Sequence, residues 1–346
     1  MKNISIIIVC GYLNDSELEK DRLIKFSKCL KAINNLKFQG FDNVIVAEYG
    51  YENRLEKFVG KNLDVTNIPY EYIFVKKEGQ YYNQSLPKNA ASELSKNEIL
   101  LYINSDIILQ PNCLDVIKNA YNDDQNYFGV CARHDVFLKN TEVDNFIIDI
   151  ANSNKYKLQT IVMQDPGWYY AMKHKPINPI NLHINTFLDE KYKNNIIYDF
   201  LSGYFVFGDF MVMTKEMYNN CKFDEDCFAL TDVYLRDRLL NMNYPVKFLH
   251  NETTCFHLCG TDYMGQTKEN DPKRDRLHQD QIFLAEKYPE LRHWLVFGFH
   301  KENLDKILKY YQKQEVIDMI DNYKTEVYWQ YFTDKDFFCN YFNYKS

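Results

Sequence analysis

The sequence lacks a hydrophobic run long enough to cross a membrane as a helix. About 18 consecutive apolar residues are needed for such a span, and polar side chains interrupt every apolar stretch well before that length. The apolar stretch at Ile4–Cys10 is short, and Asn14, Asp15 and Glu17 follow it without a small-residue cleavage site. It therefore predicts a first β-strand rather than a signal peptide.

The chain also lacks an excess of positive charge. It has 41 Lys and Arg against 48 Asp and Glu, which gives a formal net charge of −7. Because recognition of a nucleic-acid backbone depends on a basic surface, this balance argues against a nucleic-acid partner. It leaves open a small phosphorylated substrate that is held through a metal ion.

A regular cysteine framework is missing as well. The nine cysteines are odd in number, and Cys255 and Cys259 flank His257 without forming a zinc-like cluster. Others, such as Cys10 and Cys131, lie in apolar runs, where reduced buried thiols are common. The cysteines therefore favour a reducing cytosol.

Apolar residues make up 46% of the 346 residues, with 28 Tyr and 24 Phe. This is enough for one large α/β domain with an extension, or for two smaller domains. Strands are expected at Ile4–Cys10, Asn43–Ala47, Tyr70–Val75 and Ile99–Ile103, and helices at Glu17–Leu36 and Pro87–Ser95. Because strands that alternate with helices predict parallel βαβ units, residues 1–110 are expected to form a Rossmann-like half.

Residues 111–260 are expected to complete the same domain. Helices are expected at Leu114–Tyr121 and Phe228–Leu240, and strands at Tyr127–Ala132, Tyr204–Thr214, Val246–Leu249 and Thr254–Leu258. Residues 141–197 are rich in Asn, Lys and Tyr, and we expect an irregular insertion there. Residues 261–346 are expected to form a polar, mobile loop followed by a helical extension with many aromatic side chains.

The most informative stretch is the apolar run Leu100–Leu109, which contains the polar triplet Asn104-Ser105-Asp106 where a buried strand should end. A carboxylate there costs free energy unless it binds something. In open α/β sheets, ligands lie outside the carboxyl ends of the strands. Two interpretations stay open for Asp106, a turn that begins before Pro111 or a metal and phosphate site.

Other polar residues fall at comparable places. Glu48 ends the second strand, His257 lies near the end of a late strand, and Asp232 lies on a helix after Phe223-Asp224-Glu225. Carboxylates and an imidazole at strand ends can share a divalent cation, and oxygen ligands favour Mn²⁺ or Mg²⁺. Each residue also has a structural interpretation: a solvated turn for Glu48, an i, i+4 ion pair with Arg236 for Asp232, and a buried core histidine for His257.

In their order along the chain, these motifs resemble inverting glycosyltransferases of the GT-A fold, in the broad family-two group, and also chondroitin-polymerase-type transferase domains. The resemblance covers about residues 4–258. It implies an α/β fold, a Rossmann-like nucleotide-diphospho-sugar transferase with a mixed sheet and flanking helices. Residues 1–260 would be the catalytic domain, with residues 1–110 as its nucleotide-binding half and residues 111–260 as its acceptor half.

The resemblance also assigns roles to residues. Asn104-Ser105-Asp106 matches the Asp-x-Asp metal site in an Asn-x-Asp form, so Asp106 and the late His257 are expected to hold Mn²⁺ or Mg²⁺, and Asp232 is expected to be the catalytic base. The residues expected to bind the nucleotide sugar are Gly11, Tyr12, Glu48, Lys88, Asn89, Asn104, Ser105 and Asp106. Two positions depart from the family pattern, where an acid is replaced by Tyr49 and by Thr231.

Elementary chemistry agrees with these roles. A metal ion stabilises the negative charge of a leaving nucleoside diphosphate. The acceptor hydroxyl needs a carboxylate to take its proton, and a helix N-terminus would keep Asp232 ionised. A single displacement then inverts the anomeric carbon.

We therefore expect a metal-dependent transferase that moves a sugar from a nucleotide donor, with UDP-sugars favoured, to a glycan or a lipid-linked saccharide. Its expected location is the cytoplasm, with peripheral association with a membrane left open. Two alternatives remain. A sugar-phosphate nucleotidyltransferase usually has a glycine-rich, basic signature after the first strand, and this chain lacks one. A non-catalytic nucleotide-sugar-binding or scaffold protein of the same fold is the other.

Overall fold

The structure is a computed structural model of the whole chain. It describes residues 2–11, 17–63, 67–78, 83–122, 126–152, 158–162, 181–185, 196–199, 210–227, 231–244, 246–249, 253–259, 286–287, 304–310, 312–322, 339–341 and 343. The chain divides into two compact units. The first comprises Met1–Ile161, Leu182–Asp226 and Thr231–Thr267, and the second comprises Val162–Asn181, Cys227–Leu230 and Lys268–Ser346.

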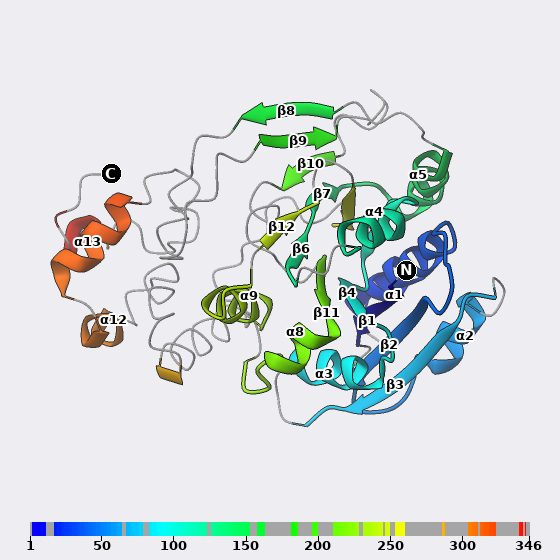
Figure 1. Cartoon of the computed structure of the whole chain (residues 1–346), viewed down its shortest axis with the longest axis horizontal. Helices are drawn as coiled ribbons and strands as arrows, with labels where there is room; N and C mark the ends of the chain where they lie inside the picture. The colour runs from blue at the N-terminus through cyan, green and yellow to red at the C-terminus, as the bar shows by residue number, and fades with distance from the viewer. Residues whose placement is uncertain are drawn as a thin grey trace. The chain divides into compact units, whose positions relative to one another are not determined.

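A seven-stranded sheet in the order β12-β6-β11-β4-β1-β2-β3 forms the centre of the first unit (Figure 1). Strands β1 (Ile4–Cys10), β2 (Asn43–Gly50), β3 (Tyr70–Lys76) and β4 (Ile99–Asn104) are parallel neighbours. Strands β6 (Phe128–Val130) and β12 (Val246–Phe248) also pair in parallel, and β11 (Met211–Thr214) lies between β6 and β4. Strand β11 runs antiparallel to both β4 and β6, so the predicted mixed sheet is confirmed.

Alternate residues of each strand point to opposite faces of this sheet. Both faces of β1 are buried, and helices cover each of them. On one face, Ile6 and Ile8 of β1 share a buried cluster with side chains of α1 (Glu17–Ile33), α2 (Glu56–Leu63) and α4 (Cys113–Ala120). On the other face, Ile7 belongs to a second cluster. Its helical members come from α3 (Ser85–Leu94), α8 (Lys215–Asn220) and α9 (Thr231–Asn241).

A four-stranded sheet in the order β10-β7-β13-β5 lies in the same unit. Its strands are β5 (Ile107–Leu109), β7 (Ala132–Val136), β10 (Ile196–Asp199) and β13 (Thr254–Leu258). Helix α5 (Asn140–Asn152) packs on it, with Phe146 edge-on to Phe256 at a ring distance of 5.3 Å. A further two-stranded sheet pairs β8 (Leu158–Val162) with β9 (Asn181–Asn185).

The region expected to be irregular contains regular structure in its described parts, namely α5, β8, β9 and β10. Helix α5 buries Val143, Phe146, Ile147 and Ile150. These residues have the i, i+3, i+4, i+7 spacing of a helix with one apolar face. Asn and Asp residues that lie among these apolar positions obscure the pattern in the sequence. The expectation of an irregular course at 141–152 is therefore wrong.

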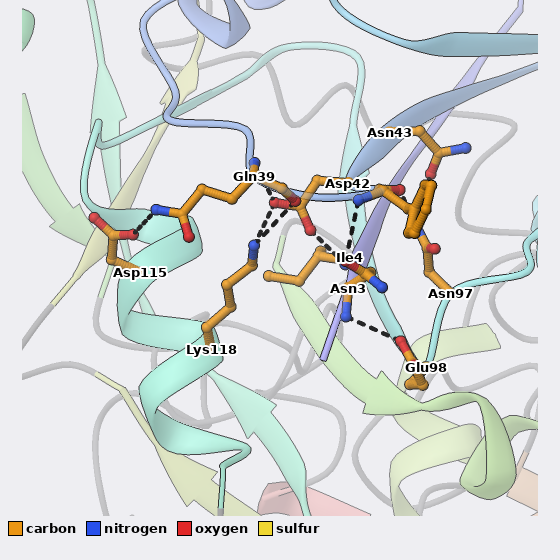
Figure 2. A network of polar contacts seen from close by, with 10 residues as sticks. Asn3, Ile4, Gln39, Asp42, Asn43, Asn97, Glu98, Asp115 and Lys118 are labelled. Atoms are coloured by element: carbon orange, nitrogen blue, oxygen red, sulfur yellow. Dashed lines mark hydrogen bonds and ion pairs between the residues drawn. The ribbon is translucent and has the colours of Figure 1, made fainter. Parts of the chain in front are cut away.

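Polar contacts of Asp42 join the amino-terminal ends of β1 and β2 (Figure 2). Asp42 also forms a buried ion pair with Lys118 of α4. We call Asp42, Lys118, Gln39 and Ile4 the amino-edge cluster. Asp42 Oδ1 accepts a hydrogen bond from the Ile4 N–H at 2.8 Å. Its Oδ2 accepts from the Gln39 N–H at 2.9 Å and from Lys118 Nζ at 2.5 Å. The Asp42 and Lys118 side chains are only 1% and 3% exposed, so this charge pair is enclosed by the protein.

In the second unit the structure describes two helices, α12 (Leu304–Tyr310) and α13 (Lys313–Asn322). Lys313 Nζ, at the start of α13, lies 4.3 Å from the centre of the Tyr341 ring. None of the described helices in the chain is long and apolar enough to span a bilayer.

Candidate functional site at the carboxyl edge of the sheet

Three neighbouring strands of the central sheet end side by side. Val9 of β1 pairs with Asn104 of β4, and Cys10 pairs with Glu48 of β2. The predicted donor-binding positions Gly11, Glu48 and Asn104 therefore lie along one edge of the sheet. The carboxyl edge of parallel strands is where α/β proteins bind their ligands.

Directly after Asn104 the chain turns at Ser105 and Asp106 and enters β5 of the four-stranded sheet. His257 of β13 pairs with Ile107 of β5, and the Leu258 N–H donates to the Asp106 carbonyl oxygen at 2.9 Å. These backbone contacts bring His257 Nε2 to 3.4 Å from Asp106 Oδ2. We call Asp106 and His257 the carboxyl-edge pair. The two residues predicted to hold a metal ion thus lie together.

The environment of Asp106 favours its ionised form. Burial raises the pKa of the Asp106 carboxyl, but the charge and hydrogen bond of His257, with the charge of Lys25, outweigh burial and leave the pKa below its usual value. The side chain is 33% exposed, yet its Oδ1 is buried and has no hydrogen-bond partner among the residues that the structure describes. Because buried polar atoms are nearly always hydrogen-bonded, this oxygen is suited to an ion or ligand.

The His257 ring is also held on its other side. Nδ1 lies 3.2 Å from Sγ of Cys259. Cys259 itself is fixed at both backbone ends, because its N–H donates to Val136 O at 3.0 Å and its carbonyl accepts from Lys25 Nζ at 3.3 Å. Contacts to the second nitrogen of a histidine orient its ring and tautomer, so Nε2 is directed toward Asp106.

The donor atoms of the carboxyl-edge pair fit a divalent cation such as Mn²⁺ or Mg²⁺, since both ions accept carboxylate oxygen and Mn²⁺ also accepts imidazole. Within the described ranges, however, no group of three or more His, Cys, Asp and Glu residues is arranged to hold a metal. An ion bound to this pair would complete its coordination with water and substrate oxygens, as Mg²⁺ commonly does beside phosphates.

Glu48 is buried, and its carboxylate is occupied by its own loop. Oε2 accepts hydrogen bonds from the Arg54 and Leu55 N–H groups, each at 3.1 Å, and from the Tyr72 hydroxyl. Burial, together with this hydrogen bond and the Glu48 charge, raises the pKa of Tyr72. These contacts fix the β2–α2 loop. A contact of Glu48 with a nucleotide base stays a prediction.

Lys88 and Asn89 lie on α3 and contact the segment that contains Phe223-Asp224-Glu225. Lys88 Nζ is 5.1 Å from the centre of the Phe223 ring. Asn89 is hydrogen-bonded to the backbone of Phe223 and to the Glu225 carboxylate. Asp224 Oδ1 accepts from the Asp226 N–H at 3.0 Å, as expected for a residue that organises a turn.

Asp232 lies in the first turn of α9 and is buried. The helix begins at Thr231, so its amide dipoles favour a negative charge at this position. The side chain of Arg236, the alternative partner of Asp232, lies outside the described residues, as do Tyr12 and the segment at 260–285.

Sequence reasoning missed Lys25 and Cys259 as neighbours of this site. Lys25 is one charge on an amphipathic helix, where a charge usually means a solvated face, and its ion pair with Asp21 at 2.7 Å follows the ordinary i, i+4 pattern. Cys259 follows His257 by two residues, which is the only signal that could have pointed to it.

No family model matches the chain, and no curated protein matches it in sequence. Among solved structures, the chain is similar to S. aureus TarS, with 12% identity over 95% of this chain and 50% of that one, at a TM-score of 0.45. It therefore spans about half the length of that TarS structure.

The chain is also similar to the 1–349 fragment of S. aureus TarS in complex with UDP-GlcNAc, with 11% identity over 96% of this chain and 84% of that one, at a TM-score of 0.46. A third similar structure is the mannosyltransferase PcManGT from Pyrobaculum calidifontis in complex with GDP-Man and Mn²⁺. The identity is 11% over 93% of this chain and 73% of that one, at a TM-score of 0.45.

Proposed function

We propose that this protein is a metal-dependent, inverting glycosyltransferase that uses a nucleotide-sugar donor. The observation that carries the proposal is the carboxyl-edge pair. Asp106 and His257 meet at 3.4 Å beside the ends of three parallel strands, and Asp106 has a buried oxygen with no partner among the described residues. This is the position, charge and donor set that a cation bound to a diphosphate requires.

In this proposal, Asp106 and His257 would hold the ion, which would supply positive charge to offset the negative charge of the departing nucleoside diphosphate. Gly11, Asn104 and Ser105 lie at the same edge and contact the donor. Lys88 and Glu48 bind the donor from the neighbouring α3 and β2. Asn104, two residues before Asp106, hydrogen-bonds the donor rather than the ion.

Asp232 is the proposed base. It accepts the proton of the acceptor hydroxyl while that oxygen attacks the anomeric carbon and the bond to the diphosphate breaks. A carboxylate can do this because proton transfer occurs as the hydroxyl becomes acidic in the transition state. The place of Asp232 in the first turn of α9 favours the negative charge of the carboxylate. The acceptor in this proposal is a glycan or a lipid-linked saccharide, and UDP-sugars are the favoured donors.

The experiment that tests the function is a screen of nucleotide sugars with Mn²⁺ and with Mg²⁺, scored for metal-dependent release of nucleoside diphosphate. We expect release from one donor class, and stabilisation of the protein against heat by the same diphosphate only when metal is present. Pyrophosphate release from a nucleoside triphosphate and a sugar phosphate would instead identify a nucleotidyltransferase. No response to any nucleotide would identify a scaffold protein.

A further inference from the structure

Helix α3 is fastened to the strand that leads to Asp106. The hydroxyls of Ser92 on α3 and Tyr102 on β4 are hydrogen-bonded at 2.7 Å, and both side chains are buried. Ala91 of α3 and Tyr102 belong to the same buried apolar cluster. The position of α3 is therefore set by the strand that ends at the carboxyl-edge pair.

The same helix holds the Phe223–Asp226 segment through Asn89. Asn89 Nδ2 donates to Phe223 O at 3.0 Å, and Asn89 Oδ1 accepts from the Phe223 N–H at 3.1 Å. The side-chain amide thus pairs with both backbone groups of one residue, as a neighbouring strand would. Nδ2 also donates to Glu225 Oε1 at 2.9 Å, so both of its N–H bonds are used within the protein.

A second asparagine, Asn83, strengthens this junction. Its Nδ2 donates to Glu225 O at 2.5 Å, and its Oδ1 accepts from the Ser85 N–H at 2.8 Å, where α3 begins. Asn83, just before α3, and Asn89, within it, therefore hold the segment at two points.

The segment in turn holds α9. Arg238 of α9 donates from Nη1 to Lys222 O at 3.0 Å. Leu235 and Leu239 of α9 lie in the same buried cluster as Phe223, whose ring is 5.1 Å from that of Tyr102. A continuous series of contacts thus runs from β4 through α3 and Phe223 to the helix that begins with Thr231 and Asp232.

We propose that Asn89 is a positioning residue that fixes the proposed base, Asp232, relative to the strand that ends at Asp106, and that it does not bind the donor. This inference rests on the proposed function, within which it replaces the expected donor contact of Asn89. The reason is the geometry of the amide. One oxygen and two N–H bonds match the Phe223 backbone and the Glu225 carboxylate, and no other side chain of this size offers the same set.

The test compares Asn89→Asp with Asn97→Asp. Asn97 is the matched control because it is also buried, and it also donates through Nδ2 to a backbone oxygen (Phe41 O, 2.8 Å) and to a side-chain oxygen (Asn43 Oδ1, 3.1 Å), at the opposite edge of the sheet. Each substitution keeps the shape of the side chain and removes its N–H donors. The loss of stability that comes from removing a buried Nδ2 donor is therefore common to both variants. A difference between them reports the particular position of Asn89.

We expect Asn89→Asp to lower kcat for transfer by about 10- to 100-fold, since a displacement of about 1 Å at a reacting group has that effect. The Kd of the nucleoside diphosphate with Mn²⁺, measured by titration calorimetry, should stay within about twofold of the wild-type value. The reason is that Asn89, in this proposal, makes no contact with the donor, so its substitution removes no ground-state binding interaction. Asn97→Asp should leave kcat unchanged. A raised Kd with unchanged kcat would show that Asn89 binds the donor, and unchanged values of both would overturn the inference.

Hydrogen exchange gives a measurement that does not depend on activity. We expect faster exchange at the amides of Leu235–Asn241, which are the N–H groups that can bond within α9, in Asn89→Asp than in Asn97→Asp. Equal exchange would contradict the inference. If the wild-type protein transfers no sugar, the proposed function fails, and the exchange result still decides whether Asn89 holds α9. If Asn89→Asp does not fold, Asn83→Asp replaces it in the test. This variant removes the N–H donor to Glu225 O and keeps an acceptor for the Ser85 N–H, so it should show both effects more weakly.

Discussion

The two edges of the central sheet each contain a buried carboxylate oxygen, and the protein treats the two differently. At the amino edge, both oxygens of Asp42 are hydrogen-bonded by the Ile4 and Gln39 N–H groups and by Lys118. At the carboxyl edge, Asp106 faces His257 with one oxygen, and its other oxygen is buried with no partner among the described residues. The first arrangement holds strands together, whereas the second leaves a charge available for a ligand.

Glu48 shows that location at the carboxyl edge does not by itself make a carboxylate available. It lies at the same edge as Asp106, yet the Arg54 and Leu55 N–H groups and the Tyr72 hydroxyl occupy it. Whether a carboxylate at this edge can bind a cation therefore depends on how completely the protein satisfies its hydrogen bonds. Four predictions test this comparison.

The largest effect is expected at Asp232. Asp232→Asn removes the group that accepts the proton of the acceptor hydroxyl, so the transfer rate should fall by about 10²- to 10⁴-fold. Binding of nucleoside diphosphate and Mn²⁺ should stay near the wild-type level, because the carboxyl-edge pair is intact. Single-turnover kinetics and titration calorimetry measure the two quantities. Transfer at the wild-type rate would remove Asp232 from the role of base.

At the amino edge the expected effect is on stability. Asp42→Ala leaves the buried charge of Lys118 without its carboxylate partner, and it removes the acceptor of two backbone N–H groups. The free energy of unfolding should fall by about 3–5 kcal/mol, the usual cost of removing one partner of a buried pair. Urea denaturation measures this change, and kcat per folded molecule should not change.

The matched control for Asp42 is a variant that removes both charges. Asp42→Ala combined with Lys118→Met should recover part of the lost stability, because an apolar replacement of a buried ion pair costs less than an isolated buried charge. If the double variant were less stable than Asp42→Ala alone, the contribution of Lys118 would lie in its packing rather than in its charge.

The third prediction concerns the open carboxylate. Asp106→Asn should weaken Mn²⁺ binding by at least about tenfold, the loss that even an outer-shell partner of a metal causes, and it should lower the unfolding free energy less than Asp42→Ala does. Titration calorimetry with Mn²⁺ measures the affinity. The control is Asp144→Asn, which removes a half-exposed carboxylate paired with Lys28 and Lys31. Equal Mn²⁺ affinities in the two variants would contradict the metal assignment.

The smallest effect is a pH dependence of the metal-free protein. His257 and Lys25 hold the pKa of Asp106 below its usual value despite burial. A carboxyl whose pKa is lowered on folding stabilises the fold above its unfolded pKa, and this contribution is lost as the pH falls through the folded pKa. The stability difference between wild type and Asp106→Asn should therefore shrink between about pH 5 and pH 2. Denaturation across this range measures it, and a constant difference would show that the Asp106 pKa is not shifted.

Much of the central sheet could be predicted because each strand shows its own local pattern. Apolar runs at Ile4–Cys10 and Ile99–Ile103 indicate buried parallel strands, and α1 and α3 were expected from their sequence patterns. Helix α2, with eight residues, was missed because it is too short to show a clear period. Helix α5 was missed because its apolar positions lie among Asn and Asp residues. Strand β5 was missed as a separate strand because Ile107–Leu109 continues the apolar run of β4.

The candidate site was predictable only as a set of residue types at strand ends. Their order along the chain suggested Asp106 and His257 as partners, but the contact depends on the pairing of β13 with β5, which no local pattern contains. The partners of Asn89 and Asp42 were beyond sequence reasoning for the same reason. Phe223 and Lys118 are remote in the chain, and a single Asn or Lys carries no signal of what it contacts.

The turn at Ser105 and Asp106 is also a point where the chain passes from the seven-stranded sheet to the four-stranded sheet. Cys131 is another, since it lies between β6 of the first sheet and β7 of the second. His257 moves with β5, because the two strands are hydrogen-bonded in register. A cation held by Asp106 and His257 would therefore stiffen the junction at Asp106 between the two sheets.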